Sequence, residues 1–283
     1  MDFKSLVETL ESLPPLSDST LLIQRLYAEG AQNVSIERLK IIIESDVLLS
    51  TNILKVINAP AYGFSRKITS ISQAITLFGT QIIYTLVMHY AMQEKIVANL
   101  RAYNITNEKF NDICHLQSAL VMQWYTNVDK KRAQFIAPLA LMMEIGKLIL
   151  AKQITLEGRI KEFKDGLVLC ENIVIYEDSF SETSSYFLSA LLFDHWNLEP
   201  LYVQILKGLD YERQYADKLK EYIEILDVVR TAINVKEMLT DASIKKASDM
   251  VALMKLDIHQ FQSAAQRVKQ TYVQNSKMKG EVK

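Results

Sequence analysis

Apolar residues recur at spacings of three and four along most of the chain, which is the period of an amphipathic helix. After Ser35, a predicted N-cap, the residues Ile36, Leu39 and Ile43 fall on one side of such a helix. Glycine and proline number only 8 and 5 among 283 residues, so few positions interrupt a helix. The sequence therefore predicts an all-α protein.

Several helix boundaries can be placed from capping and breaking residues. The first predicted helix covers residues 3–12 and ends before Pro14, because proline disfavours a helical conformation in the residue before it. A capping box between Ser70 and Gln73 predicts the start of another helix, which Gly79 is expected to end.

Residues 167–180, "LVLCENIVIYEDSF", leave two alternatives open. Their content of Val, Ile and Tyr is typical of a short β-hairpin, whereas the surrounding periodicity favours helix. We favour helix here and keep the hairpin as the alternative.

Composition and charge exclude several classes of protein. Lys and Arg number 32 against 33 Asp and Glu, so the balanced charge gives no reason to expect a nucleic-acid partner. The most apolar stretch, residues 133–151, contains Glu144 and Lys147, so no membrane insertion is expected. Cys114 and Cys170 form no disulfide framework. We expect a cytoplasmic protein.

The four histidines show no spacing typical of a metal site. No His-x-x-x-His pair or His-Asp dipeptide occurs, and a surface or core role is the simpler interpretation for His89, His115, His195 and His259. The basic cluster "DKKR", residues 129–132, is typical of a solvated helix end, with a phosphate contact as the alternative.

Several separated blocks resemble the HDOD family of bacterial signalling domains. They comprise "LPPL" from residue 13, "NAPAYG" from residue 58 with Asn58, Tyr62 and Gly63, and "EIGKLIL" from residue 144. The resemblance extends over roughly residues 13–239, and the order of its blocks makes it more specific than any one motif.

This resemblance implies an N-terminal helical layer packed on a degenerate HD-type helical bundle. The HDOD-like domain would cover residues 1–240, with the layer at 1–100 and the bundle at 101–240. Residues 241–283 are expected to form a helical extension that packs on the bundle, with a dimer surface as the alternative.

HD phosphohydrolases bind divalent metal through histidines and a His-Asp pair, and the resemblance locates those ligand positions here. The His-Asp pair falls on Met143 and Glu144, and two further histidine positions fall on Gln117 and Ser185. Another expected histidine pair is missing at residues 209–210. A thioether is a poor ligand for a hard divalent ion. We therefore expect no metal, no cofactor and no catalytic residue.

The degenerate HD cleft is the candidate pocket, defined by Gln117, Met143, Glu144 and Ser185. It could survive as a ligand pocket or be filled by side chains such as Met143. Glu144 could pair with a neighbour or face solvent. Asn58, Tyr62 and Gly63 form the family-signature turn.

The resemblance implies a non-catalytic regulatory protein that binds signalling proteins, in motility or cyclic-dinucleotide pathways among others. A homo-oligomer is a further option. The alternative function is a residual metal-dependent phosphohydrolase acting on a nucleotide. A nucleic-acid binder is a third hypothesis, which the charge balance disfavours.

Overall fold

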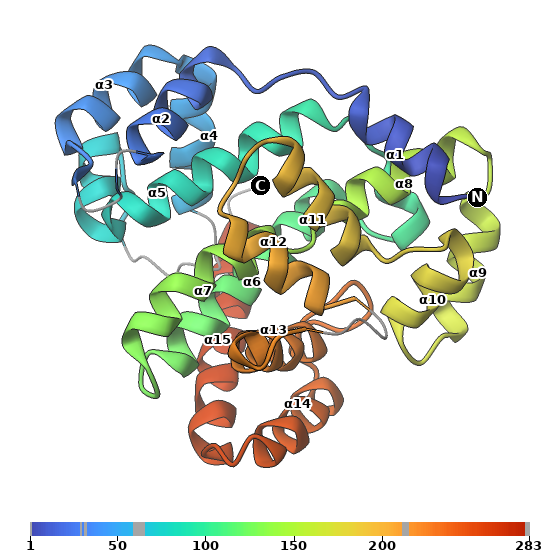
Figure 1. The fold of residues 1–283 in the computed structure, drawn as a ribbon. Coiled ribbons are helices and arrows are strands. Elements are labelled where there is room, and N and C mark those ends of the chain that lie inside the picture. Colours follow the sequence, from blue (N-terminus) through green and yellow to red (C-terminus); the bar gives the residue numbers. More distant parts are fainter. Residues whose placement is uncertain (1, 29, 31–32, 59–65, 211–214, 281–283) are drawn as a thin grey trace. The chain divides into compact units, whose positions relative to one another are not determined.

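The computed structural model describes residues 2–28, 30, 33–58, 66–210 and 215–280. Within these ranges every regular element is a helix, and the one β-type feature is an isolated bridge between Ile233 and Met238 (Figure 1). The prediction of an all-α protein is confirmed.

The chain divides into two compact units. Unit 1 contains residues 1–13 and 96–269, and unit 2 contains residues 14–95 and 270–283. The domain boundaries expected from the sequence, at residues 100 and 240, stay a prediction.

Unit 1 is a helical bundle. Its helices are α1 (Phe3–Glu11), η3 (Leu100–Tyr103), α6 (Asn107–Tyr125), α7 (Lys130–Met142), α8 (Gly146–Leu156), α9 (Ile160–Leu169), α10 (Ile173–Ser181), α11 (Ser185–His195), α12 (Pro200–Gly208), η4 (Asp217–Leu219), α13 (Lys220–Ala232), α14 (Asp241–Leu253) and the first half of α15 (Ile258–Gly280).

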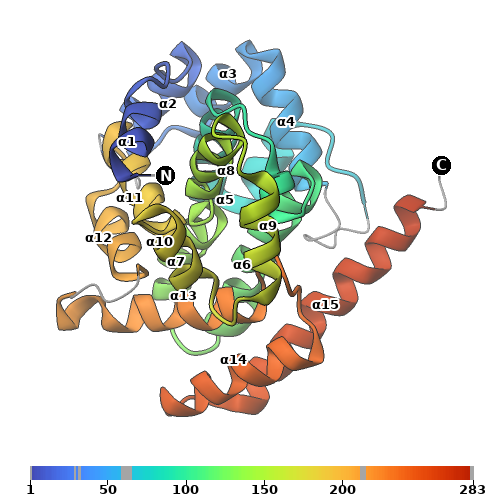
Figure 2. The ribbon, with the colours of Figure 1, turned by 90° about the vertical axis from the view of Figure 1, so that its right-hand side faces the viewer.

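Helix α8 forms the centre of unit 1, where it contacts α1, α9, α11 and η3 (Figure 2). Every residue from 136 to 151 is buried, across the end of α7 and most of α8. Two of these buried residues, Glu144 and Lys147, are charged. The core of unit 1 therefore contains ionic groups, which are rarely buried unless they are paired.

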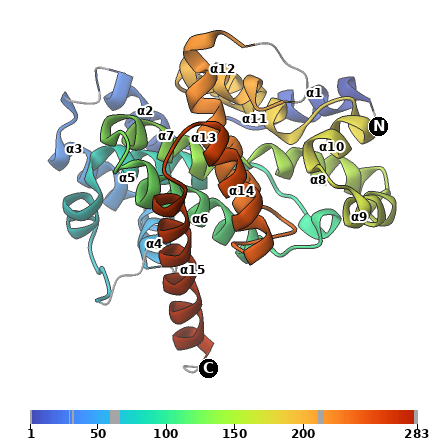
Figure 3. The ribbon, with the colours of Figure 1, turned by 90° about the horizontal axis from the view of Figure 1, so that it is seen from below.

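The C-terminal helices of unit 1 add a second packing layer. Helix α13 packs against α14 and α6 (Figure 3). The ring of Phe261 in α15 lies edge-on to Trp124 of α6, with their centroids 5.0 Å apart. Both aromatic side chains are fully buried, so α15 begins as part of the bundle core.

Residues 167–180 are helical, in two separate helices rather than a hairpin. Helix α9 ends at Leu169, and Asn172 caps α10 by accepting hydrogen bonds from the backbone N–H groups of Val174 and Ile175. A side chain that satisfies two exposed N–H groups fixes the start of a helix. This cap outweighs the strand preference of the β-branched residues that follow it.

Unit 2 contains four helices among its described residues before the end of α15, namely α2 (Asp18–Ala28), α3 (Ile36–Ser45), α4 (Val47–Ile57) and α5 (Ile71–Lys95). Leu39 and Ile43 are fully buried as predicted, but Ile36 is 57% exposed. Ile36 lies on the same side as Ile43, but it is the first residue of α3, and the burial of this side begins one turn later, at Leu39.

Gly79 breaks the continuous path of α5. Its φ of 76° and ψ of 165° lie outside the helical region, so two helical segments meet there. Such a φ is readily adopted by glycine alone, and this position accounts for the helix end predicted from the sequence. At the start of α5, the Ser70 hydroxyl accepts a hydrogen bond from the Gln73 backbone N–H, as the predicted capping box requires. The Gln73 side chain, however, accepts the backbone N–H of Thr69 instead of that of Ser70.

In the described part of the chain, two helical stretches, residues 71–95 and 130–156, are long and apolar enough to cross a membrane. In the second stretch 89% of the most apolar window is buried inside the protein, as expected for the core of a folded bundle. The first stretch is interrupted by the non-helical Gly79.

Candidate functional site

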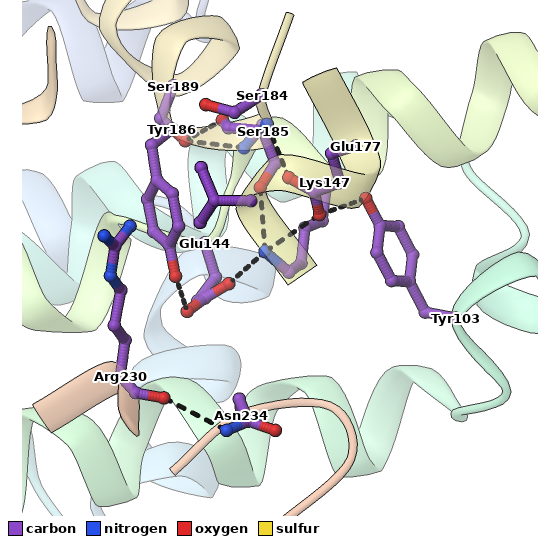
Figure 4. A network of polar contacts seen from close by, with 12 residues as sticks. Tyr103, Glu144, Lys147, Glu177, Ser184, Ser185, Tyr186, Ser189, Arg230 and Asn234 are labelled. Atoms are coloured by element: carbon purple, nitrogen blue, oxygen red, sulfur yellow. Dashed lines mark hydrogen bonds and ion pairs between the residues drawn. The ribbon is translucent and has the colours of Figure 1, made fainter. Parts of the chain in front are cut away.

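Unit 1 brings three of the four predicted cleft residues, Gln117, Glu144 and Ser185, into one buried network. Figure 4 shows Glu144 and Ser185 on either side of Lys147. Gln117 extends from α6 and donates its Nε2–H to Glu144 Oε1 at 2.8 Å and to the carbonyl of Ile233 at 2.9 Å. Ser185, the first residue of α11, is joined to Glu144 through the ammonium of Lys147. The network thus links helices that lie far apart in sequence.

Lys147 is the centre of this network. Its Nζ lies 2.7 Å from Glu144 Oε2, 2.8 Å from Ser185 Oγ and 3.3 Å from Glu177 Oε1. The side chain is 2% exposed, so the ammonium is almost completely shielded from water. Two carboxylates and one hydroxyl replace the hydration of the ammonium.

Glu177 joins the network from α10. Its Oε1 accepts a hydrogen bond from the hydroxyl of Tyr103 in η3 at 2.8 Å, and its Oε2 accepts the backbone N–H of Ser185 at 2.8 Å. The carboxylate is fully buried. Glu177 therefore connects η3, α10 and the start of α11 to Lys147.

The rings of Tyr103 and Tyr186 and the guanidinium of Arg230 lie around the ionic groups. Tyr186 donates its hydroxyl to Glu144 Oε1 at 2.8 Å, and its ring lies beneath both Lys147 and Arg230. The Arg230 guanidinium is paired with Asp227 and also donates to the carbonyl of Leu209 at 2.8 Å. Cations over a ring face are attracted by its quadrupole, so Tyr186 stabilises the charges as well as the carboxylate.

The electrostatics keep Lys147 and Glu144 charged. Burial alone would lower the pKa of Lys147, but Glu144 and Glu177 outweigh this effect and raise it. Burial would raise the pKa of Glu144, yet the Lys147 ammonium and the hydrogen bonds from Gln117 and Tyr186 lower it. Burial, followed by the nearby charge of Glu144, raises the pKa of Tyr186, so its hydroxyl stays a donor.

Gly146 allows the close approach of α8 and α11 that holds Ser185 in place. A Cβ at this position would lie 2.0 Å from the Ser185 carbonyl oxygen and 2.6 Å from the Ser189 nitrogen. The Gly146 N–H donates to Ser189 Oγ at 2.8 Å, and that hydroxyl donates to the carbonyl of Met143 at 2.7 Å. The glycine of the "EIGKLIL" block is therefore a packing requirement.

Met143 contributes to the hydrophobic core. Its side chain is fully buried. Its backbone carbonyl accepts the hydrogen bond from the Ser189 hydroxyl. Glu144 does not face solvent, since only 1% of its side chain is exposed. Of the two alternatives for Glu144, pairing with a neighbour is the one observed.

The donors at the ligand positions do not fit a divalent metal. Gln117 directs an N–H toward Glu144, and the Lys147 ammonium stands between the oxygens of Glu144 and Ser185. A metal ion bound to these oxygens would lie against a positive charge. Across the described residues, no group of three His, Cys, Asp or Glu side chains could hold a metal ion.

The four histidines differ in burial. His195 and His259 are exposed, and His89 is buried with its ring 2.8 Å from Gln93 Nε2. His115 is buried in α6, and burial lowers its pKa to about 3. It is therefore a neutral core side chain at ordinary pH.

Sequence reasoning missed Lys147, Glu177 and Tyr103 as members of the site. Lys147 follows Glu144 by three residues within an apolar stretch, and this spacing could have indicated a buried ion pair. Glu177 follows a run of apolar residues, 173–176, and its position next to Asp178 gives no sign that it is buried. Tyr103 carries no comparable signal, because its partner is distant in sequence.

The family-signature turn lies in unit 2, and Asn58 is its described residue. The Asn58 Nδ2 donates to the carbonyls of Leu54 at 2.7 Å and Ile68 at 2.8 Å, while Oδ1 accepts the Ile68 N–H at 2.8 Å. The amide thus ties the end of α4 to the segment before α5. Tyr62 and Gly63 lie outside the described residues.

Comparisons with known proteins agree with an all-helical, HD-type fold. The profile of the HDOD domain matches residues 13–208. The chain belongs to the HDOD domain family. No curated protein matches the sequence.

Solved structures share the fold at low sequence identity. A candidate phosphohydrolase from Shewanella amazonensis has a TM-score of 0.71 at 14% identity, covering 96% of this chain and 97% of that one. A candidate signal transduction protein from Marinobacter aquaeolei has a TM-score of 0.69 at 16% identity, with 95% and 60% covered. A virulence factor from Campylobacter jejuni has a TM-score of 0.56 at 22% identity, with 95% and 99% covered.

Proposed function

We propose that this protein is a non-catalytic regulatory member of the HDOD family, which acts in the cytoplasm by binding signalling proteins. One observation carries the non-catalytic part of the proposal. At the position of the expected His-Asp pair, Met143 belongs to the core and Glu144 is neutralised by Lys147. Both oxygens of this carboxylate face protein groups, Gln117 and Tyr186 at Oε1 and the Lys147 ammonium at Oε2, which favours a structural role over activation of a metal-bound water.

Binding to a protein partner is supported by exposed apolar side chains in unit 2. Ile41 of α3 and Val47 and Leu48 of α4 are 58%, 77% and 56% exposed. Apolar groups left in water are typical of surfaces that bind other proteins. The family relationship favours partners from bacterial signalling, with motility and cyclic-dinucleotide circuits as the first to examine, and the balanced charge disfavours nucleic acid.

The non-catalytic proposal is tested with purified protein dialysed against Mn²⁺, Mg²⁺ or Zn²⁺. We expect less than stoichiometric tightly bound metal and no hydrolysis of bis(p-nitrophenyl) phosphate above the rate in metal-containing buffer. The opposite result, stoichiometric metal together with turnover that a Glu144→Gln variant abolishes, would favour the phosphohydrolase alternative.

Partner binding is tested by affinity capture from the native host with the wild-type chain and a Leu48→Glu variant. We expect defined signalling proteins to be retained by the wild type and lost with the variant, because a carboxylate in an apolar contact is costly to desolvate. A circular dichroism spectrum matching the wild type establishes that the variant is folded. Equal capture by both chains would show that α4 is not the binding surface.

A further inference from the structure

We propose that α1 exchanges between two copies of this chain, so that the α1 helix of each copy packs on α8 and α11 of the other. The partner of this surface is then a second copy of the chain. The inference goes beyond the proposed function, because it concerns self-association through unit 1 and not the binding of signalling proteins through α4. The HDOD match begins at residue 13, after the end of α1, so the family relationship assigns this helix no role.

Helix α1 is an amphipathic segment docked on unit 1. Leu6 and Leu10 are 0% and 5% exposed, while the side chains of Lys4 and Glu8 are 84% and 65% exposed. Apolar residues four apart lie on the same side of a helix, and such a segment binds by laying that side on an apolar surface. Its nine residues are too few for a helix that is stable alone in water, so α1 requires a surface to dock on.

The surface that receives α1 is formed by α8 and α11. Helix α8 packs along α1 (Figure 1), and the Thr9 hydroxyl donates to Gln153 Oε1 of α8 at 2.9 Å. The ring of Phe3 lies 6.0 Å from the ring of Phe187 in α11, measured between centroids. Because two copies of the chain are identical, the α1 helix of a second copy makes the same contacts on this surface.

A short segment with two prolines connects α1 to the rest of the chain. Pro14 and Pro15 are exposed. Leu13 and Leu16 on either side are buried, so the pivot is confined to the prolines. The residue before each proline is held extended, which disfavours a tight reversal of the chain and keeps α1 on an arm. Exchange of an identical element through such a hinge is a low-cost route to a dimer.

The balance between the closed monomer and the exchanged dimer depends on protein concentration. Along the chain, α1 is separated from the remainder of unit 1 by all of residues 14–95. Docking on the same chain is favoured by an effective concentration, which is on the order of millimolar for a short connection and falls as the connection lengthens. The exchanged dimer should therefore become more abundant as the protein concentration approaches that range.

The experiment is chemical crosslinking at the contact between α1 and α11. One full-length chain carries Phe3→Cys and a second carries Phe187→Cys, both with Cys170→Ser to remove the less buried native thiol. The two chains are mixed at about 0.5 mM, close to the effective concentration, and treated with a short bis-maleimide. Mass spectrometry identifies the linked peptides. A single chain that carries both Phe3→Cys and Phe187→Cys is the positive control.

We expect the mixture to give a covalent dimer linked between positions 3 and 187, and light scattering to find a dimer fraction of the wild type that rises with concentration. Adding Leu6→Glu to the Phe3→Cys chain should lower the yield of the link about tenfold, because a carboxylate in an apolar contact is costly to desolvate. Lys4→Glu, which adds the same side chain on the exposed side of α1, should leave the yield unchanged. Circular dichroism establishes that both variants are folded.

The proposal is overturned if the positive control links within one chain while the mixture gives no dimer, because α1 then stays on its own chain. A positive control that gives no link overturns it as well, since α1 would not dock on α11. A wild-type dimer that persists with Leu6→Glu would place the interface elsewhere and also contradict exchange. The capture experiment with Leu48→Glu is independent of these results, so the two proposals can fail separately.

Discussion

Unit 1 contains two groups of residues with similar chemistry and different burial. In one, Lys147 pairs with Glu144 and Glu177, and these three side chains are at most 2% exposed. In the other, Arg132 of α7 pairs with Glu221 of α13, with 29% and 44% of their side chains exposed. Each group also includes a tyrosine that donates to a glutamate, Tyr103 to Glu177 and Tyr125 to Glu221.

The contribution of an ion pair to stability depends on what surrounds the pair. Water and salt can replace either partner of the Arg132–Glu221 pair, so its contribution to stability is small. Around Lys147, the protein itself supplies every solvating group, and removal of one charge leaves the others buried without compensation. The same contact is thus optional at the surface and required in the core.

The largest expected effect comes from Lys147→Met, which keeps the volume and removes the charge. We expect a loss of about 3–5 kcal/mol in the free energy of unfolding, because Glu144 and Glu177 would be left as neighbouring buried carboxylates. Urea unfolding measures this change. Arg132→Met is the matched control, with an expected loss below about 1 kcal/mol. Equal losses would remove the distinction between the two groups.

Gly146→Ala tests whether the close approach of α8 and α11 supports the buried group. The added Cβ would contact the backbone of Ser185 and Ser189, which cannot move without separating the helices, and we expect a loss of about 3 kcal/mol. Gly158→Ala is the control: its φ is 70° and no atom lies within 4 Å of the new Cβ. Backbone strain alone predicts a loss of about 1 kcal/mol there. A Gly146 variant as stable as the Gly158 variant would contradict the packing argument.

The pH dependence of stability distinguishes the buried ion pair from His115, a neutral side chain buried in α6. Burial lowers the pKa of His115 from 6.5 to about 3, so the unfolded chain binds a proton that the folded chain excludes across this interval. Stability should therefore fall as the pH drops below 6.5, by about 1.4 kcal/mol per pH unit once the unfolded imidazole is protonated.

The ion pair should respond only at the acidic end of that interval, below pH 4.5, and at high pH. Because the pKa of Glu144 is lowered, its contribution is present above its ordinary value of 4.5 and is lost as the pH falls further. Because the pKa of Lys147 is raised, its contribution is lost only as the pH rises past its ordinary value of 10.5. Urea unfolding from pH 7 to pH 4.5 should show a slope in the wild type that is absent in His115→Leu. A slope that persists in the variant would point to another group.

The smallest expected effect is that of Glu221→Gln. We expect a loss of about 0.5–1 kcal/mol at low salt, which shrinks in 1 M NaCl because surface charges are screened. Unfolding curves at the two salt concentrations test this. A loss that is large and independent of salt would mean that the Arg132 group behaves as the buried one does.

The fold could be predicted from the sequence to a greater extent than the site. Periodic apolar residues, the Ser35 cap and Gly79 act locally, so helices and their ends follow from short segments of sequence. The exposure of Ile36 could not be foreseen, because it depends on which turn of α3 meets its neighbours.

The site depends on contacts between distant segments. Alignment with a known motif located Gln117, Glu144 and Ser185, but nothing local indicates that Glu177 and Tyr103 reach the same point. The role of Lys147 follows only when all of its oxygen partners are seen together. Hydrophobic pattern predicts that a segment is buried and does not specify how a charge within it is satisfied.

The ion pair between Glu144 and Lys147 joins residues three apart, where the turn after α7 enters α8, whereas the pair with Glu177 joins separate helices. Closing the shorter loop costs less chain entropy, so the lysine has a local partner before α10 docks. Arrival of Glu177 then completes the set and makes correct assembly of α10 and α11 favourable. The acidic group that is near in sequence satisfies the ammonium locally, and the distant one makes the position of α10 matter to the core of unit 1.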